Sequence, residues 1–475
     1  MYEKINPISP ELLSVMSEKI QRKSKIDLDA FWKYGVKRGL RNPDGTGVMA
    51  GLTNICSVDG YYVEDGERVP KAGILKYRGI NINDIVEACE KENRFGFEEV
   101  VYLLLFGTLP TVNQLKLFKE ILSDCRVLPE TYIEDVLMTN ASVDIMNKLA
   151  RCVLVSYSFD ENPDDISVEN VLRQSVQIIA QIPVMVCYAY QVKRMKYYGK
   201  SMYFHPEKKE LSTAETVLRS IRSDKKYTDE EAKLLDICLI LHAEHGGGNN
   251  STFTNRVLTS SGTDTYSAFA ASIGSLKGSR HGGANIKVTK MIEDIKANVA
   301  DTKDEKQIFD YLEKIIRKEA GDGSGLVYGM GHAVYTLSDP RAVILKRKAK
   351  DFAYKNGFED DFELINTIER LTPEVFRKVK GKNKVMCANV DLYSGLIYNM
   401  LGIPQDLFTP LFATARVAGW SAHRLEELLT GGKIIRPAYK NIALPKKYVV
   451  MDERIENYNS SEEYIPNDQR IYRED

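Results

Sequence analysis

The sequence predicts a mostly α-helical protein of more than one domain, with one small β hairpin near its N-terminus. Three observations predict this fold class. The chain has 475 residues, whereas about 150 residues per domain is the usual expectation. Apolar residues recur at helical spacing over most of the chain after Asn81. A single strand-like pattern with a turn dipeptide precedes these helical segments.

Residues 1–50 are expected to form a helical arm. A turn is predicted at 42–45, because the proline and the Asp-Gly pair in that Asn-Pro-Asp-Gly run break the helical pattern. At the other end, residues 441–475 are expected to form a C-terminal tail, whose polar part from Ile455 onward wraps the surface or is partly disordered.

The β hairpin is predicted from two apolar and aromatic stretches, 52–58 and 61–63. Between them stands Asp59-Gly60, a dipeptide typical of a tight hairpin turn. Residues 73–79 are predicted to add another short strand, since they carry β-branched and aromatic residues between two glycines.

Helices account for the rest of the prediction. Apolar residues share one face from Ile82 onward, and a second helix from Phe97 is closed by Gly107 and Pro110. Further helices are expected at 113–125, 142–158, 165–192, 213–223 and 228–243. The uncharged run 174–192 contains four glutamines and Pro183, which favours a buried helix over a membrane span.

The composition excludes several classes of protein. The formal net charge is −1, without the basic surplus typical of nucleic-acid binders, yet a positive pocket for acidic substrates remains compatible with it. The seven cysteines are scattered and form no C-x-x-C pair, a usage that favours a reducing compartment. No apolar signal core stands at the N-terminus. We therefore expect a cytoplasmic protein that binds neither nucleic acid nor membrane.

Histidine and glycine cluster in one part of the chain. Of only six histidines, His245, His281 and His332 each stand beside glycine. Glycine permits unusual backbone angles and close approach of a ligand, so these rings are candidates for presentation at the ends of helices.

Other chemistries have weaker support. His242 and His245 are three residues apart, but the run HAEH lacks the H-E-x-x-H pattern of zinc proteases. No G-x-S-x-G nucleophile elbow and no G-x-x-x-x-G-K-[ST] phosphate loop is present. We therefore expect no metal, and a metal-dependent hydrolase is the less favoured alternative.

Several short motifs, taken in order, resemble the signatures of the citrate synthase family. They are HAEHGGGNNST at 242–252, LKGSRHGGAN at 276–285, GMGHAVY at 329–335 with DPR at 339–341, NVD at 389–391, ATARVAG at 413–419 and RP at 436–437. Each motif alone is weak, but six in the family's order are specific. The resemblance covers residues from about 50 to 440.

This resemblance implies a two-domain helical fold and a homodimer whose sites are completed by the other subunit. The large domain is expected at 51–282 plus 393–440, and the small domain at 283–392. The implied reaction joins acetyl-CoA to oxaloacetate with water and yields citrate and CoA. The enzyme would thus be an acyltransferase that converts the acyl group into an alkyl group, with the CoA thioester as substrate and no cofactor.

The resemblance also implies roles for individual residues. Asp391 is expected to remove a proton from the thioester methyl group, with His281 as hydrogen-bond donor to the enol or enolate oxygen. His332 is expected to polarise and protonate the ketone. Since arginine binds carboxylates in a planar, bidentate manner, the family implies Arg341, Arg416 and Arg436 as oxaloacetate ligands, with His245 as a further contact.

Arg416 stands out from the residues alone, because small apolar residues surround it within 413–419. A charge on such a helix face needs a partner.

Two alternatives stay open: one is a related enzyme with another thioester substrate, and the other is a relative without catalytic activity. A 2-methylcitrate synthase would use propionyl-CoA, and one methylene contributes only about 1–3 kcal/mol of discrimination. A non-catalytic CoA-binding relative would lack part of the trio His281, His332 and Asp391. The CoA side also departs from the family, because Met330 and Thr336 replace an aromatic and a basic residue. The cluster Lys346, Arg347, Lys348 and Lys350 is the candidate for the CoA phosphates, or else a solvated helix face.

Overall fold

The computed structural model describes residues 9–42, 46–64, 67–381, 385–445, 448 and 450–451. The chain divides into two compact units, one of residues 50–435 and one that combines 1–49 with 436–475. Most of the predicted turn at 42–45, most of the predicted tail at 441–475 and the whole of its polar part from Ile455 onward lie outside the described residues. The predicted boundary between a large and a small domain within 50–435 stays a prediction.

No described residue of the unit formed by the chain ends is buried. This unit contains α1 (Pro10–Ser24) and α2 (Asp29–Lys33). Ser9 caps α1 by accepting a hydrogen bond from Leu12 N at 3.1 Å, and Pro10 occupies the first helical turn, where its missing N–H costs nothing. No residue of α2 is buried, and 66% of the Trp32 side-chain surface is exposed.

The unit of residues 50–435 begins with a three-stranded antiparallel sheet. Its strands are β1 (Cys56–Glu64), β2 (Glu67–Tyr77) and β3 (Ile80–Asn81), in the order β1-β2-β3. The predicted strand at 73–79 is confirmed as the end of β2 and the turn that follows it.

The hairpin turn predicted at Asp59-Gly60 is wrong. Both residues lie inside β1, where the register shifts between Asp59 and Tyr61, and the strands pair on to Glu64 opposite Glu67. Glycine inside a strand marks a bulge or a close approach of another segment. Here a Cβ on Gly60 would lie 2.6 Å from Val334 O, so the glycine serves a tertiary contact rather than a turn.

Helices form the remainder of this unit. The helices are α3 (Ile82–Lys91), α4 (Phe97–Phe106), α5 (Val112–Cys125), α6 (Ile145–Ser156), α7 (Val168–Tyr198), α8 (Thr213–Ile221), α9 (Asp229–His242), α10 (Asn250–Ser260), α11 (Thr265–Lys277), α12 (Ala284–Asn298), α13 (Glu305–Arg317), α14 (Pro340–Asn356), α15 (Glu359–Lys380), α16 (Val390–Met400) and α17 (Phe408–Leu429). Short helical turns occur at Ile133–Met138, Tyr157–Phe159 and Gln405–Leu407. The predicted helices are thereby confirmed, with shifted ends.

The long apolar helix α7 is part of the core. Among the described residues it is the one helix long and apolar enough to cross a membrane, but 94% of its most apolar window is buried inside the protein. It continues through Pro183. The prediction of a buried helix at 174–192 is therefore confirmed.

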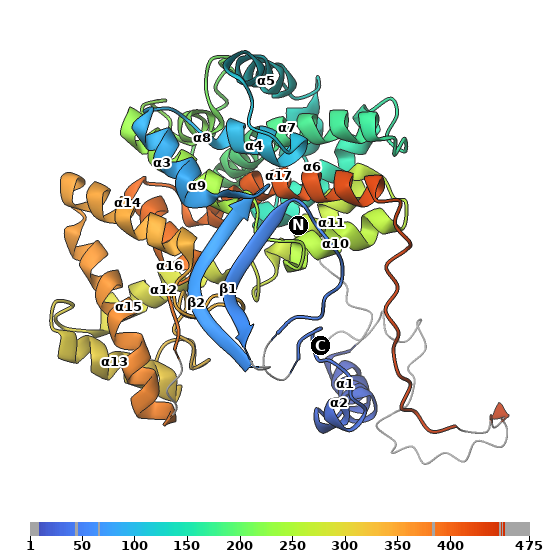
Figure 1. The fold of residues 1–475 in the computed structure, drawn as a ribbon, viewed down its shortest axis with the longest axis vertical. Coiled ribbons are helices and arrows are strands. Elements are labelled where there is room, and N and C mark those ends of the chain that lie inside the picture. The colour runs from blue at the N-terminus through green and yellow to red at the C-terminus, as the bar shows by residue number, and fades with distance from the viewer. Residues whose placement is uncertain are drawn as a thin grey trace. The chain divides into compact units, whose positions relative to one another are not determined.

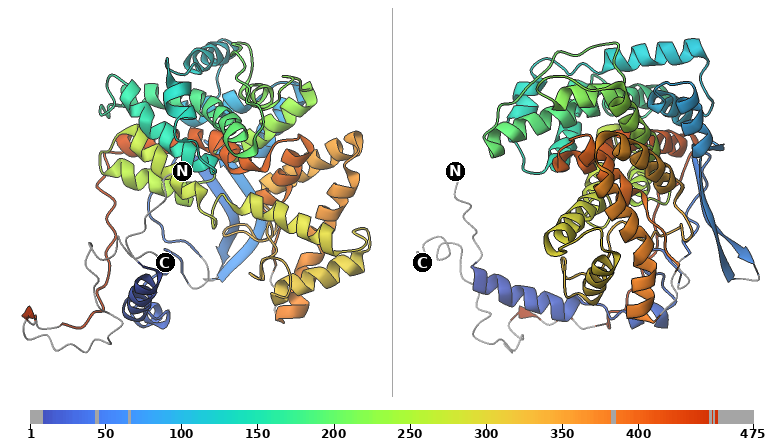
Figure 2. Two further views of the ribbon diagram at one scale, coloured as in Figure 1. Left: turned by 180° about the vertical axis from the view of Figure 1, so that it is seen from behind. Right: turned by 90° about the vertical axis from the view of Figure 1, so that its left-hand side faces the viewer.

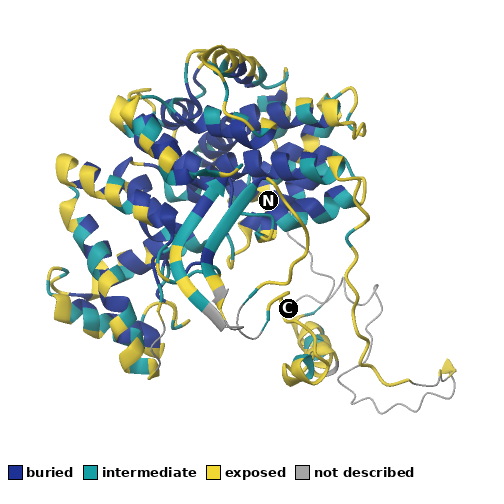
Figure 3. Ribbon diagram, viewed as in Figure 1, coloured by how far each residue is buried: buried dark blue, intermediate teal, exposed yellow. Residues whose placement is uncertain are grey.

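Helix α17 runs through the middle of this unit, as Figures 1 and 2 show. Helices α12–α15 lie on one side of it, and α4–α9 lie on the other side. It is buried continuously from Phe408 to Leu425, and Figure 3 shows this core in dark blue. A polar side chain on α17 is therefore held in a dry, rigid setting.

Candidate functional site

Six of the seven predicted site residues lie in the unit of residues 50–435, most of them at helix ends. They are His245 between α9 and α10, His281 between α11 and α12, His332 before α14, Arg341 in the first turn of α14, Asp391 in the first turn of α16 and Arg416 within α17. The charges of Arg341, Arg416 and His281 all act on His245, and those of Arg341 and Arg416 act on Asp391. The structure thus brings these six together.

Arg436 is the exception. It is exposed and belongs to the unit formed by the chain ends. The structure therefore does not place it with the other six, and its role stays a prediction.

The ring of His332 is oriented by backbone N–H groups two and three residues further along the chain. Its Nδ1 accepts hydrogen bonds from Val334 N at 3.0 Å and Tyr335 N at 3.1 Å. The ring stacks on Tyr335 with centroids 4.7 Å apart and meets His245 edge-on at 5.1 Å. Because Nδ1 is an acceptor, a neutral ring carries its proton on Nε2.

The segment that carries His332 is tied to the segment that leads into Asp391. Gly331 N donates to Cys387 O at 2.7 Å, and Asn389 N donates to Gly329 O at 2.8 Å. The Asn389 side chain adds a bond from Nδ2 to Gly331 O at 2.9 Å. These backbone and side-chain bonds fix the separation of His332 and Asp391.

The carboxyl group of Asp391 has a raised pKa. Burial raises its pKa to about 6, Arg341 opposes that rise and the charge of Asp339 adds to it. Its backbone N–H donates to Asn389 Oδ1 at 3.0 Å, which caps α16. No described side chain hydrogen-bonds its carboxylate. Such a group is ionised at neutral pH yet basic enough to accept a proton.

His281 is presented by a run of turns after α11. Its Nε2 lies 3.1 Å from Asn249 Oδ1 and 3.2 Å from Ser251 Oγ. Burial lowers its pKa to about 4, helped by the charge of Arg416. The ring is therefore neutral at pH 7 and carries one N–H.

The environment of Ser251 bears on the tautomer of His281. Trp420 Nε1, which can only donate, points to Ser251 Oγ at 3.2 Å. The hydroxyl proton is thereby directed to Asn249 Oδ1, 2.8 Å away, or to His281 Nε2. When it goes to Nε2, the ring proton sits on Nδ1 and is available to a substrate.

Arg416 is a buried cation with unused donors. Its exposed fraction is 0%. Its Nε donates to His242 O at 2.7 Å, and its guanidinium packs on the Phe412 ring at 4.8 Å. Nη1 and Nη2 have no hydrogen-bond partner among the described residues. Burial lowers the pKa of Arg416, against the nearby charge of Glu244. Unpaired buried donors of this kind suit an anion that binds from outside.

Arg341 is already engaged on one edge. Its Nε and Nη2 donate to the two carboxylate oxygens of Asp339 at 3.0 and 2.7 Å. Burial lowers the pKa of Arg341, but the charge and the hydrogen bonds of the Asp339 carboxylate outweigh burial and raise this pKa above its usual value. The guanidinium is thus held rigidly at the start of α14, with Nη1 left for a further acceptor.

His245 is also available to a ligand. It is buried, and its Nε2 has no hydrogen-bond partner among the described residues. Burial lowers its pKa well below the usual range, and the charges of Arg341 and His332 lower it further. A neutral ring with an unpaired nitrogen beside two arginines can contact a bound carboxylate or hydroxyl.

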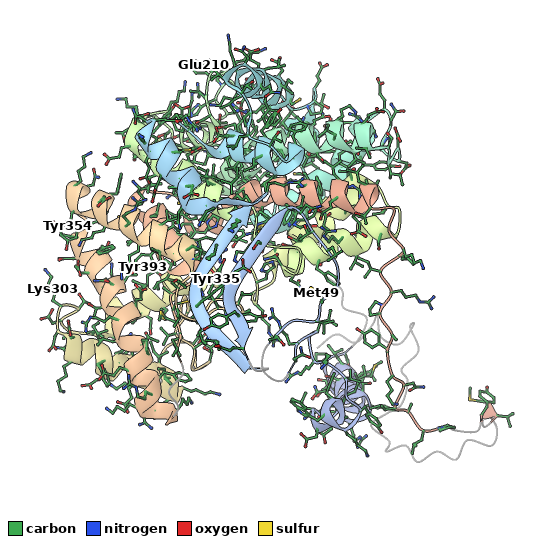
Figure 4. All side chains as sticks on the ribbon, viewed as in Figure 1. Met49, Glu210, Lys303, Tyr335, Tyr354 and Tyr393 are labelled. Atoms are coloured by element: carbon green, nitrogen blue, oxygen red, sulfur yellow. The ribbon has the colours of Figure 1, made fainter. Side chains whose placement is uncertain are left out.

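The β sheet supports the His332 segment from outside the helices. A Cβ on Gly73 would lie 2.2 Å from Ser338 O, and Gly73 N donates to Ser338 Oγ at 3.1 Å. Tyr335 packs against the same glycine, and Figure 4 shows it beside β2. The sheet therefore positions the segment between His332 and Arg341.

The predicted CoA-phosphate cluster on α14 has partners within the chain. Lys346 pairs with Glu369 at 2.8 Å. Arg347 and Lys348 both pair with Glu90, at 3.2 and 2.8 Å. These ion pairs favour the interpretation as a helix face paired on the surface, and a role in CoA binding stays a prediction.

Sequence reasoning missed several supporting residues. Asn249 and Ser251 stand in the motif that carried the resemblance, so their proximity to His245 was a usable signal. Tyr335 and Asp339 also stand in motifs of that resemblance, and their contacts with His332 and Arg341 are only two or three residues away in the chain. Trp420 carries no comparable signal, because its hydrogen bond to Ser251 joins segments 169 residues apart.

The arrangement has a definite chemical capacity. A carboxylate can accept a proton, neutral imidazoles can donate to oxygen atoms, and arginines can hold an anion. Within the described ranges, no group of three or more histidine, cysteine or acidic side chains is arranged to hold a metal ion. The chemistry that these groups support is acid–base catalysis on an anionic carbonyl compound.

Comparison with known proteins places this site in context. A family model described as "Citrate synthase, C-terminal domain" matches residues 42–438. The citrate synthase of Synechocystis sp. is 34% identical over 415 residues, which cover 86% of this chain and 93% of the relative. The 2-methylcitrate synthase of Shewanella oneidensis is 31% identical over 386 residues, or 80% of this chain and 92% of the relative.

Solved structures give the same result. Citrate synthase from Thermotoga maritima superposes with a TM-score of 0.67 at 28% identity, covering 86% of this chain and 98% of that one. Citrate synthase from Thermoplasma acidophilum, solved as a ternary complex with carboxymethyl coenzyme A and oxaloacetate, has a TM-score of 0.70 at 26% identity. It covers 86% of this chain and 97% of that one.

Proposed function

The chain belongs to the citrate synthase family, and on that premise we propose that it joins acetyl-CoA to oxaloacetate and water, giving citrate and free CoA. The observation that carries this proposal is the convergence of Asp391 with the neutral ring of His281 and with His332, beside Arg341 and Arg416. Enzymes of this family are transferases that convert an acyl group into an alkyl group.

The first step is removal of a proton from the thioester methyl group. The Asp391 carboxylate accepts this proton, and its raised pKa makes it a better base than an exposed aspartate. The electron pair moves to the thioester oxygen. A hydrogen bond from the Nδ1–H of His281 stabilises the resulting enol or enolate, in the tautomer where Ser251 donates to Nε2.

The second step forms the carbon–carbon bond. The enol carbon attacks the ketone carbon of oxaloacetate, and the ketone oxygen takes a proton from Nε2 of His332. That assignment is supported by the two backbone N–H groups that occupy Nδ1. Water then adds to the thioester carbonyl of citryl-CoA, and the CoA thiol leaves. No metal and no cofactor other than the substrate thioester takes part in this scheme.

Oxaloacetate is held by its two carboxylates. The unpaired Nη1 and Nη2 of Arg416, the remaining edge of Arg341 and Nε2 of His245 are the proposed contacts. The Thermoplasma acidophilum homologue, solved with oxaloacetate, supports this substrate class for the present chain.

We propose a homodimer in which Arg436 of one subunit completes the site of the other. The unit formed by the chain ends exposes large apolar side chains such as Trp32 and Tyr439, and this exposed apolar surface supports the proposal. A partner subunit would cover it. The free thiols of all seven cysteines support placement in the cytoplasm.

A second candidate is 2-methylcitrate synthesis from propionyl-CoA, favoured by relatives of that name at 30–31% identity. The deciding experiment compares kcat/KM for acetyl-CoA and propionyl-CoA with oxaloacetate, following release of the CoA thiol and identifying the acid formed. A higher value for acetyl-CoA supports citrate synthase. A clear preference for propionyl-CoA replaces it with the second candidate, and no condensation with either thioester refutes both.

A further inference from the structure

Besides Arg416, helix α17 carries the buried His423, which contacts the loop of His245. Nε2 of His423 lies 3.0 Å from Glu244 Oε1, and both side chains have an exposed fraction of 0%. The same Glu244 oxygen accepts a hydrogen bond from Gly246 N. One carboxylate oxygen is thus held from two sides.

The other side of the His423 ring is also occupied. Its Nδ1 lies 3.1 Å from Arg256 Nε and 2.7 Å from Arg256 Nη2. Arg256 in turn forms ion pairs with Glu426 and Glu427. Since arginine can only donate, Nδ1 accepts. A neutral His423 ring therefore carries its proton on Nε2 and donates it to Glu244.

The second carboxylate oxygen of Glu244 lies close to Arg416. A Cβ on Gly419 would be only 2.1 Å from Glu244 Oε2, and Gly419 stands one helical turn after Arg416 on α17. Among the charges that act on the Arg416 guanidinium, that of Glu244 has the largest effect. The loop itself docks here, because Gly419 N donates to Ala243 O at 3.2 Å.

These neighbours do not pair. Glu244 Oε2 and both Nη atoms of Arg416 lack hydrogen-bond partners among the described residues. A buried carboxylate and a buried guanidinium gain strongly from a direct, charge-assisted bond. Something must therefore keep the carboxylate in its present position, and the bonds to Glu244 Oε1 from His423 and Gly246 are the restraints available.

We propose that His423 is a positioning residue that holds Glu244 off Arg416, so that the Arg416 guanidinium stays free for a substrate carboxylate. Glu244 then supplies a nearby negative charge that stabilises the buried cation without occupying its donors. Gly419 is part of the device, since any side chain there would displace Glu244 Oε2. The inference rests on the proposed function, in which Arg416 binds oxaloacetate.

The test is a double-mutant cycle with the full chain, read as the dissociation constant of oxaloacetate by calorimetry. His423→Leu removes the bond that restrains Glu244, so Glu244 pairs with Arg416 and the dissociation constant rises by about tenfold or more. Glu244→Gln removes the competing charge. The double variant His423→Leu/Glu244→Gln is therefore expected to bind within about threefold of Glu244→Gln alone.

His205 provides a matched control. It is also a buried histidine, with Nε2 2.9 Å from Arg222 O. This partner does not belong to the network of His423, Glu244 and Arg416. His205→Leu should leave oxaloacetate binding unchanged even if it lowers the melting temperature. Should His423→Leu fail to fold, His423→Met, which fills a similar volume and cannot donate to Glu244, allows the same cycle.

Two outcomes overturn the inference. One is an unchanged dissociation constant in both His423 variants. The other is a double variant that binds oxaloacetate as weakly as His423→Leu, because a merely structural loss would not be relieved by Glu244→Gln. Failure of the unmodified protein to bind oxaloacetate would instead refute the proposed function, so the two failures are distinguishable.

Discussion

Asn389 donates a hydrogen bond from its side-chain amide to the carbonyl oxygen of Gly331 at 2.9 Å. The same side chain accepts from Asp391 N at 3.0 Å through Oδ1. One residue thus links the residue before His332 to the helix that carries Asp391. The proposed acid and the proposed base are positioned relative to each other by this link.

Two substitutions of Asn389 should separate its bond to Gly331 O from its capping of α16. Asn389→Asp keeps the acceptor that caps α16 but loses the donor to Gly331, whereas Asn389→Ala loses both. We expect kcat to fall about 10- to 100-fold in both, as small misplacements of reacting groups do. Only Asn389→Ala should also lose about 1 kcal/mol of stability through the missing cap. Steady-state kinetics at pH 8 and thermal unfolding measure the two effects. Unchanged kcat in Asn389→Asp would contradict the linking role.

Asp391→Asn should nearly abolish proton removal while leaving oxaloacetate binding intact. The amide has the shape of the carboxyl group but cannot accept the methyl proton. The measurement is exchange of the thioester methyl protons with deuterated water, followed by NMR in the presence of oxaloacetate. Exchange at the normal rate would place the base elsewhere.

The pH profile should have an acidic limb set by Asp391. Its pKa is raised to about 6, and the base must be ionised, so kcat/KM should fall about tenfold per pH unit below that value. The folded state also binds this proton more tightly than the unfolded state, so the group favours folding less as pH rises through 4 to 6. Asp391→Asn should therefore raise the melting temperature at pH 7.5 more than at pH 4.

Arg416→Met should weaken substrate binding. The variant loses the two unpaired Nη groups, and the dissociation constant of oxaloacetate should rise about 100-fold, as for other bonds to a charged group. It also loses the hydrogen bond from Nε to His242 O and leaves the buried Glu244 without its nearby cation, so the melting temperature should fall as well. A lower melting temperature with unchanged binding would assign Arg416 a structural role.

Gly73→Ala should damage catalysis from outside the site. Its Cβ would meet Ser338 O at 2.2 Å, so the segment between His332 and Arg341 must shift. We expect a lower kcat. The free energy of unfolding should fall by about 1–3 kcal/mol, which is the typical cost of overpacking, and the melting temperature should fall with it. Gly51→Ala is the control, because nothing lies within 4 Å of a Cβ there. Equal effects of the two substitutions would show that the sheet does not support the site.

Much of the fold and of the site was determined by the sequence alone. Helical periodicity, caps such as Gly107 and the buried character of α7 are local properties, because they depend on residues within a few turns of one another. The ordered motifs likewise selected the histidines and Asp391 as candidates, and the apolar surroundings of Arg416 predicted a charge that needs a partner.

Only the tertiary structure decided the relations between distant segments. Asp59-Gly60 has the sequence of a turn, but Gly60 lies in a strand because Val334 approaches it from another part of the chain. The sequence shows a basic cluster on α14, and only the fold shows that Lys346, Arg347 and Lys348 pair with Glu369 and Glu90. The restraint of Glu244 by His423 joins positions 179 residues apart. Such contacts depend on packing, which local sequence patterns do not encode.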